Sequence, residues 1–128
     1  MKIRVYYKDT DCGGIVYHAN YLNFCEMARS ELFFKNGKSP AINGCHFAIK
    51  HIDANFVKPA FLGDLLEITT KIKKIRHTSF ILFQQIHKEK NLIFEMEITL
   101  VFLCKDGKIQ KIPSQTKEFF KQVLDQST

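Results

Sequence analysis

Residues 18–36, HANYLNFCEMARSELFFKN, decide the fold of this chain. Their apolar side chains recur at helical spacing and form one stripe of Tyr21, Phe24, Cys25, Ala28 and Leu32. Further apolar residues lie outside that stripe, namely Leu22, Met27, Phe33 and Phe34. A helix that is apolar on more than one side is normally enclosed by other elements. The sequence therefore predicts a helix over residues 18–36 with the rest of the chain packed around it.

Short strand-like segments flank this helix. They cover residues 3–7, 46–57, 64–76, 79–88 and 92–104. The last is the clearest, because its apolar residues alternate on one face: Leu92, Phe94, Met96, Ile98, Leu100 and Phe102. In 64–76 the alternation changes phase, which predicts a β-bulge near Lys73 and Lys74. Ser114 is expected to cap a short final helix.

Consecutive strands joined by short turns pair antiparallel, so we expect an α+β fold in which an antiparallel β-sheet is wrapped around a long central helix. The chain has 128 residues and no Pro/Gly/Ser-rich linker. Residues 1–128 are therefore expected to form a single domain. The edges and faces of such a sheet are commonly covered by a second copy of the chain.

Composition excludes several classes of protein. No run approaches the roughly 18 apolar residues of a membrane-spanning helix, and the N-terminus lacks the apolar run of a signal peptide. We therefore expect a cytoplasmic protein with no transmembrane segment. The four cysteines form no C-x-x-C pair, which favours reduced, individually buried thiols. The histidines show no metal-ligand spacing, so no metal site is expected.

Positive charge points to an anionic partner. Lys and Arg outnumber Asp and Glu by 19 to 13, which gives a net charge of +6. Such a surplus attracts nucleic acid, an anionic membrane or a phosphorylated cofactor. The basic residues are not interleaved with aromatic ones as in a base-stacking surface, which disfavours nucleic acid.

A turn that carries carboxylates precedes the helix, within residues 6–17, YYKDTDCGGIVY. A helix N-terminus offers unpaired N–H groups and a partial positive charge that stabilise a carbonyl oxygen or an anion. A carboxylate such as Asp11 beside it is the minimum apparatus for acyl transfer. The residues alone leave other interpretations open: Asp11 as a turn former, His18 bonded to a backbone carbonyl, and Tyr7 as a core aromatic.

One long motif resembles the signature of a known family. The pattern Asp9-x-Asp11-x-x-Gly14-Ile15-Val16-Tyr17-His18-x-x-Tyr21, followed by Glu26-x-x-Arg29, is similar to that of the hotdog-fold acyl-CoA thioesterases of the 4-hydroxybenzoyl-CoA thioesterase family, and within it to the YbgC branch. Residues 55–60, 63–68 and 76–79 are also similar to that branch. The resemblance therefore covers nearly the whole chain.

The resemblance implies a hotdog fold, assembly into a homodimer or homotetramer with sites at subunit interfaces, and hydrolysis of acyl-CoA without metal or cofactor, CoA being part of the substrate. Asp11 matches the essential carboxylate, as general base or nucleophile, and the amide of His18 matches the group that polarises the thioester carbonyl. The side chains of Tyr7 and His18 complete the implied site. Lipid metabolism is the implied setting.

The basic residues give candidates for binding CoA. Its phosphates suit the densest basic group, which includes Lys58, Lys73 and Arg76. With their neighbours, the candidate substrate-binding residues are Lys58, Pro59, Lys73, Arg76, Thr78 and Ser79. A solvated strand face and a turn before a strand are the competing interpretations for these positions.

Two other functions compete with a thioesterase. An apolar strand followed by Asp9-x-Asp11 is also typical of aspartate-dependent phosphatases, but those need a parallel sheet with crossover helices, whereas residues 64–104 read as strand after strand. A hotdog module that binds acyl-CoA or acyl carrier protein without turnover is the second alternative. Acyl carrier protein, which is acidic, is a candidate partner of the basic surface.

Overall fold

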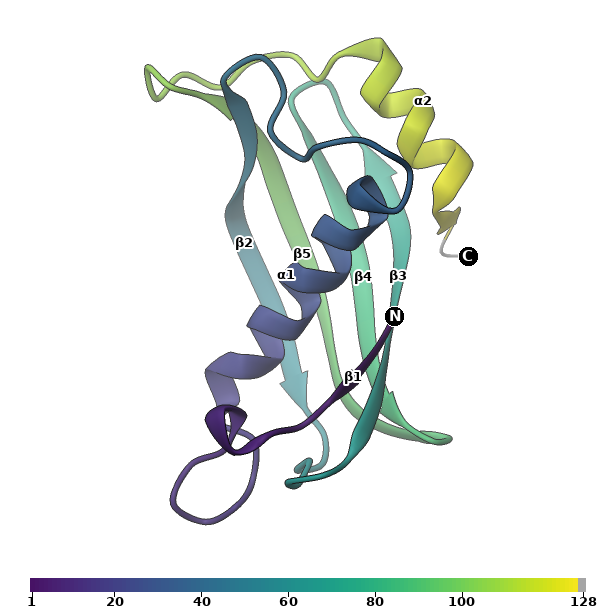
Figure 1. The fold of residues 1–128 in the computed structure, drawn as a ribbon. Coiled ribbons are helices and arrows are strands. Elements are labelled where there is room, and N and C mark those ends of the chain that lie inside the picture. Colours follow the sequence, from purple (N-terminus) through teal and green to yellow (C-terminus); the bar gives the residue numbers. More distant parts are fainter. Residues whose placement is uncertain (127–128) are drawn as a thin grey trace.

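One long helix lies against the inner face of a curved sheet (Figure 1). The computed structural model describes residues 1–126. Its elements are β1 (Lys2–Arg4), the 3-10 turn η1 (Tyr7–Asp9), α1 (His18–Phe34), β2 (Cys45–Phe56), β3 (Leu65–Ile75), β4 (Ser79–Lys88), β5 (Asn91–Cys104), α2 (Ser114–Val123) and β6 (Asp125–Gln126). The strand order is β1-β3-β4-β5-β2, and β6 pairs with β3. All neighbours are antiparallel except β3 and β6. The expected α+β arrangement is confirmed.

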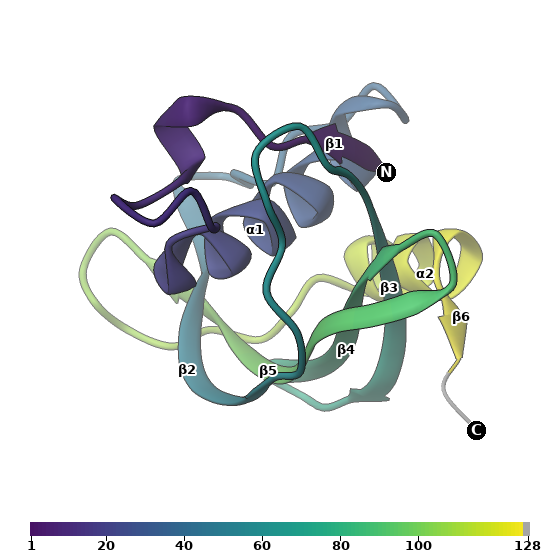
Figure 2. The same ribbon diagram turned by 90° about the horizontal axis from the view of Figure 1, so that it is seen from below.

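The core lies between α1 and the sheet, which curves beneath the helix (Figure 2). The predicted alternation in β5 is confirmed, because Phe94, Met96, Ile98, Leu100 and Phe102 are all buried. From α1 the core receives Tyr21, Phe24, Cys25, Ala28 and Phe33. Removing this apolar surface from water is the main favourable contribution to folding.

Aromatic side chains close the core at the C-terminal end of α1. Phe33 lies 5.2 Å from Phe119 and 5.6 Å from Phe120 of α2, measured between ring centroids. Phe120 in turn lies 4.6 Å from Phe80 of β4. These contacts place the second half of α1 beside α2 and the first residues of β4.

The predicted bulge in β3 is confirmed. The register between β3 and β4 shifts between Ile72 and Lys74, so Lys73 is the extra residue. A second register shift lies in β2, between Ile49 and His51. Sequence analysis did not predict this second shift, because the apolar alternation around it is weak.

The expected strand over residues 3–7 is wrong beyond Arg4. Tyr7 begins a 3-10 turn, and its side chain is 80% exposed rather than on a face shared with Ile3 and Val5. The cause is Asp9, which is only 4% exposed and whose Oδ2 accepts a hydrogen bond of 2.9 Å from the Tyr6 amide. Its carboxylate thereby turns the backbone where the apolar alternation predicts a strand.

The expected cap of the last helix is also wrong. Ser114 is the first residue of α2, the cap position is Pro113, and no side chain caps this helix. The helix itself is confirmed. Pro113 sets the extended backbone that precedes the first turn, so the helix starts without a serine cap.

The expectation of four reduced, buried thiols is wrong. Cys45 and Cys104 are joined by a disulfide between β2 and β5, where they face each other directly. Cys12 is exposed and free. Cys25 fits the expectation, since it is buried and desolvation raises the pKa of its thiol to about 12. The sequence does not predict this disulfide, because the two cysteines are 59 residues apart and only the strand register of the folded protein brings them together.

Within residues 1–126, no helix is long and apolar enough to cross a membrane.

Candidate active site

The turn between η1 and α1 holds Asp11 in a defined conformation. Its Oδ1 accepts a hydrogen bond of 2.8 Å from the Gly13 amide, and its own amide donates to the Ile15 carbonyl at 2.9 Å. Gly14 has a φ of +77°, a conformation that side chains disfavour. The side chain of Asp11 is exposed, and its Oδ2 accepts no hydrogen bond from any residue in the described part of the chain. One carboxylate oxygen is therefore fixed and the other is open to a ligand.

The start of α1 presents unpaired backbone donors. His18 is the first helical residue, and Tyr17 at the cap position makes no side-chain cap. Tyr17 donates its own amide to the Asp9 carbonyl at 3.0 Å, which ties the helix start to the turn that holds Asp11. No acceptor described within residues 1–124 takes the His18 amide. Such a donor, at the positive end of a helix, can stabilise a developing oxyanion.

A second loop, residues 57–64, supports this turn from the other side. The Val16 amide donates to the Ala60 carbonyl at 2.9 Å, and the Ala60 amide donates to the hydroxyl of Tyr21 at 3.0 Å. Burial raises the pKa of Tyr21. Its ring stacks on Phe94 with 5.3 Å between centroids. Tyr21 thus connects the core to the loop that braces the helix start.

Replacing Tyr21 with phenylalanine is expected to lower the free energy of unfolding by about 1–3 kcal/mol, because the Ala60 amide is left buried without its acceptor. Urea denaturation followed by circular dichroism measures the change. Tyr17→Phe is the matched control, since the Tyr17 side chain is exposed and should lose nothing measurable. Equal stability of the two variants would contradict a supporting role for the Tyr21 hydroxyl.

The predicted catalytic residues lie at one end of the sheet. Tyr7 belongs to η1, a few residues before Asp11, and its carbonyl accepts hydrogen bonds from Thr10. The His18 ring lies 6.3 Å from that of Phe56, at the last residue of β2. Lys58 and Pro59 are exposed in the loop that follows, whose Ala60 contacts the Asp11 turn. Phe56, which the sequence analysis did not single out, therefore joins this group through its contact with His18.

The remaining predicted residues lie at the opposite end. Arg76 and Thr78 lie in the turn between β3 and β4, and the buried Ser79 is the first residue of β4, at the end of the sheet where α1 ends. The 17 residues of α1 separate them from Asp11 by about 25 Å. Lys73 is ion-paired with Glu97. One chain therefore does not bring this set to Asp11.

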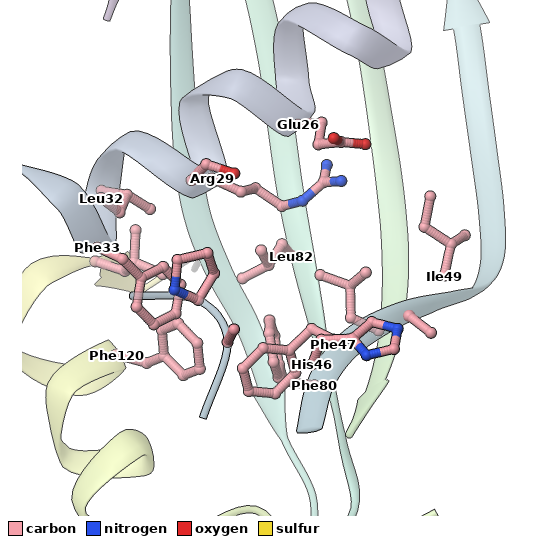
Figure 3. Close-up of a pocket in the computed structure, with 16 residues that line it drawn as sticks. Glu26, Arg29, Leu32, Phe33, His46, Phe47, Ile49, Phe80, Leu82 and Phe120 are labelled. Atoms are coloured by element: carbon pink, nitrogen blue, oxygen red, sulfur yellow. The ribbon is translucent and has the colours of Figure 1, made fainter. Parts of the chain in front are cut away.

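A pocket of about 480 Å³ lies between the second half of α1 and β2 (Figure 3). Its wall is largely apolar and includes Phe47, Phe80, Leu82, Leu100 and Phe120. The ionisable residues that line it are Glu26 and Arg29 from α1, with His46 at the start of β2. Sequence analysis did not locate this pocket, although the charged pair Glu26-x-x-Arg29 on a helix with apolar residues on more than one side was a signal for it.

An antiparallel sheet curved around one long helix is the arrangement of the hotdog class of proteins. The thioesterase superfamily matches residues 13–94, and this chain belongs to that superfamily. The acyl-CoA thioesterase YbgC of Helicobacter pylori is 50% identical over 95 residues, covering 74% of this chain and 71% of that protein. The acyl-CoA thioester hydrolase YbgC of Escherichia coli O157:H7 is 37% identical, covering 94% of this chain and 93% of its own.

Solved structures show the same fold. A probable thioesterase from Bartonella henselae superimposes with a TM-score of 0.83 at 31% identity, over 88% of this chain and 97% of its own. A 4-hydroxybenzoyl CoA thioesterase superimposes with a TM-score of 0.85 at 26% identity, over 93% of this chain and 95% of its own. The family resemblance and the hotdog fold expected from the sequence are thus confirmed.

Proposed function

We propose that this chain hydrolyses acyl-CoA thioesters, with Asp11 and the start of α1 as the reacting centre. The observation that carries the proposal is the juxtaposition of an exposed carboxylate, held by its own turn, with the unpaired amide of His18. The names of the YbgC relatives support the same reaction. A thioester needs little further activation, so a carboxylate and an oxyanion donor suffice.

Ionised Asp11 has two routes through this reaction. As a general base it takes a proton from water, and the water oxygen adds to the thioester carbon. As a nucleophile its own oxygen adds, giving an anhydride that water then hydrolyses. In both routes the carbonyl oxygen becomes negative near the His18 amide, and collapse expels the CoA thiolate, which takes up a proton. The side chains of His18 and Tyr7 are the proposed proton or hydrogen-bond partners of these steps.

The two separated groups of predicted residues come together in a dimer. β2 is bonded on one side to β5, and its other side is a free edge of 12 residues. Two copies related by a two-fold axis would pair β2 antiparallel with itself. The Phe56 end of one strand, beside His18, then lies next to the Cys45 end of the other. Each Asp11 turn would thereby approach the pocket and the β3–β4 turn of the second copy.

This assembly assigns the candidate CoA-binding residues. Lys58 and Pro59 would come from the chain that holds the reacting Asp11, and Arg76, Thr78 and Ser79 from its partner. Lys73 would contribute charge at the same edge of the site. The same proposal includes a tetramer of two such dimers and a cytoplasmic location. It also includes acyl carrier protein as a second partner and activity without any cofactor.

Thiol release from purified protein tests the function. The protein is incubated with acyl-CoA esters of aromatic, short-chain and long-chain acids. At least one ester is expected to release thiol well above the uncatalysed rate, and this rate is expected to be unchanged by a metal chelator. Saturable binding of the esters without thiol release would instead favour the non-catalytic hotdog module. The values of kcat/KM across the panel rank the acyl groups.

A further inference from the structure

The proposed reaction leaves Arg29 unused. This side chain comes from the middle of α1 and lines the apolar pocket (Figure 3). Its Nη1 donates a hydrogen bond of 2.9 Å to Oε1 of Gln84, which is 0% exposed. The amide of Gln84 in turn donates to the Cys25 carbonyl and to the Thr70 hydroxyl, both at 3.0 Å. The guanidinium is therefore held in place by a buried polar network that joins α1, β3 and β4.

In the described part of the chain, Arg29 forms no close ion pair in the pocket, and Glu26 on the preceding turn of α1 is the acidic residue that shares the pocket with it. Among the side chains described for residues 1–124, no carboxylate lies within 4.0 Å of it, and Glu26 is exposed at the rim. Desolvation lowers the pKa of Arg29, which means that its charge is held in an unfavourable environment. A guanidinium has five N–H donors in a planar fork, and Gln84 takes one of them. The others are available to a ligand.

We propose that this pocket receives the acyl group and that Arg29 selects acyl groups that end in a carboxylate; this inference rests on the proposed thioesterase function. The apolar walls, including Leu82, Leu100 and Phe120, suit the hydrocarbon part of such a group. The fork of Arg29 suits a carboxylate at its far end, because the two can form paired hydrogen bonds.

The position of the pocket fits this use. Its rim includes residues 46–49 of β2, on the free edge of the sheet. In the two-fold pairing described above, that part of β2 lies beside the Phe56 end of the second copy. An ester held at the second copy's Asp11 would then extend its acyl group into this pocket. Arg29 would meet the end of the chain, away from the reacting carbon.

Two esters of equal length test the selection in the unmodified protein. Suberoyl-CoA carries a terminal carboxylate, and octanoyl-CoA ends in a methyl group. The wild-type dimer is expected to hydrolyse suberoyl-CoA with a kcat/KM at least about tenfold higher, as a charged hydrogen bond would give. An equal rate, or a preference for octanoyl-CoA, would overturn the role of Arg29 even if no variant could be prepared.

Variants of Arg29 locate the preference. Arg29→Met is expected to lower kcat/KM for suberoyl-CoA about ten- to a hundredfold and to change that for octanoyl-CoA by less than about threefold. Arg29→Lys should keep part of the preference, because it keeps the charge. Lys35→Met, an exposed cation at the end of the same helix, is the matched control and should change neither value. If Arg29 served only to stabilise the fold, its replacement would lower kcat/KM for both esters together.

A binding experiment separates this inference from the proposed reaction. Monomethyl suberate has one carboxylate and dimethyl suberate has none, so calorimetric titration of the wild-type protein should show tighter binding of the first. If the protein hydrolysed neither CoA ester but still showed this difference in binding, the proposed thioesterase reaction would be contradicted and the proposed role of the pocket would stand. Equal binding of the two compounds would overturn the proposed role of the pocket. The role would also be overturned if Arg29→Met dissociated in sedimentation while its preference between the two esters stayed unchanged, because Arg29 would then serve the subunit contact.

Discussion

Asp11→Asn is expected to lower kcat/KM for acyl-CoA hydrolysis about a thousandfold, because an amide can neither take a proton from water nor attack a thioester at a useful rate. The change removes the charge and keeps the shape. Asparagine Oδ1 can still accept the hydrogen bond that Asp11 now takes from the Gly13 amide at 2.8 Å. The fold, the thermal midpoint and the sedimentation coefficient should therefore stay the same, and only thiol release should fall.

A second aspartate offers a close control for this variant. Asp106 lies exposed in the turn after β5, and its Oδ1 accepts a hydrogen bond of 2.9 Å from the amide two residues later, at Lys108. It thus has the same local geometry as Asp11 without a helix start beside it. Asp106→Asn should retain full activity. Full activity of Asp11→Asn would contradict the proposed mechanism, and an equal loss in both variants would point to turn stability rather than catalysis.

Strand prediction succeeded where side chains alternate and failed where a polar group redirects the backbone. The five alternating apolar residues of β5 are buried on the inner face of the sheet, as their spacing predicts. The change of phase at Lys73 corresponds to a β-bulge in the structure. Beyond Arg4 the apolar alternation continues, yet Asp9 turns the chain through a hydrogen bond to the Tyr6 amide. An aspartate in sequence does not show which amide it will bond.

Chain-local features of the site were accessible from the sequence, and long-range ones were not. Asp11 and Gly14 lie in the turn just before His18, so the sequence could bring a carboxylate near a helix start, although the residues alone left its role open. The pocket draws on α1, β2, β4, β5 and α2, and its members share no motif. The contact of Cys45 with Cys104 depends in the same way on register between β2 and β5.

Assembly is the second large effect that we expect, and Ile49→Asp tests it. Ile49 lies on the free edge strand and is 51% exposed in the single chain. If two copies pair through β2 about a two-fold axis, Ile49 lies near the axis, and the variant brings two carboxylates into one apolar contact. Like charges at an interface cost several kcal/mol, so the dimer should dissociate at least about a hundredfold more readily.

Sedimentation velocity over a range of protein concentrations measures this dissociation, and thiol release per chain should fall on dilution in parallel. Ile109→Asp is the matched control, since Ile109 is 53% exposed and lies outside β2. A dimer of unchanged stability in Ile49→Asp would place the subunit contact elsewhere than on this strand. Dissociation with undiminished activity per chain would show that one chain carries a complete site, and the assignment of Arg76, Thr78 and Ser79 to the partner would then be wrong.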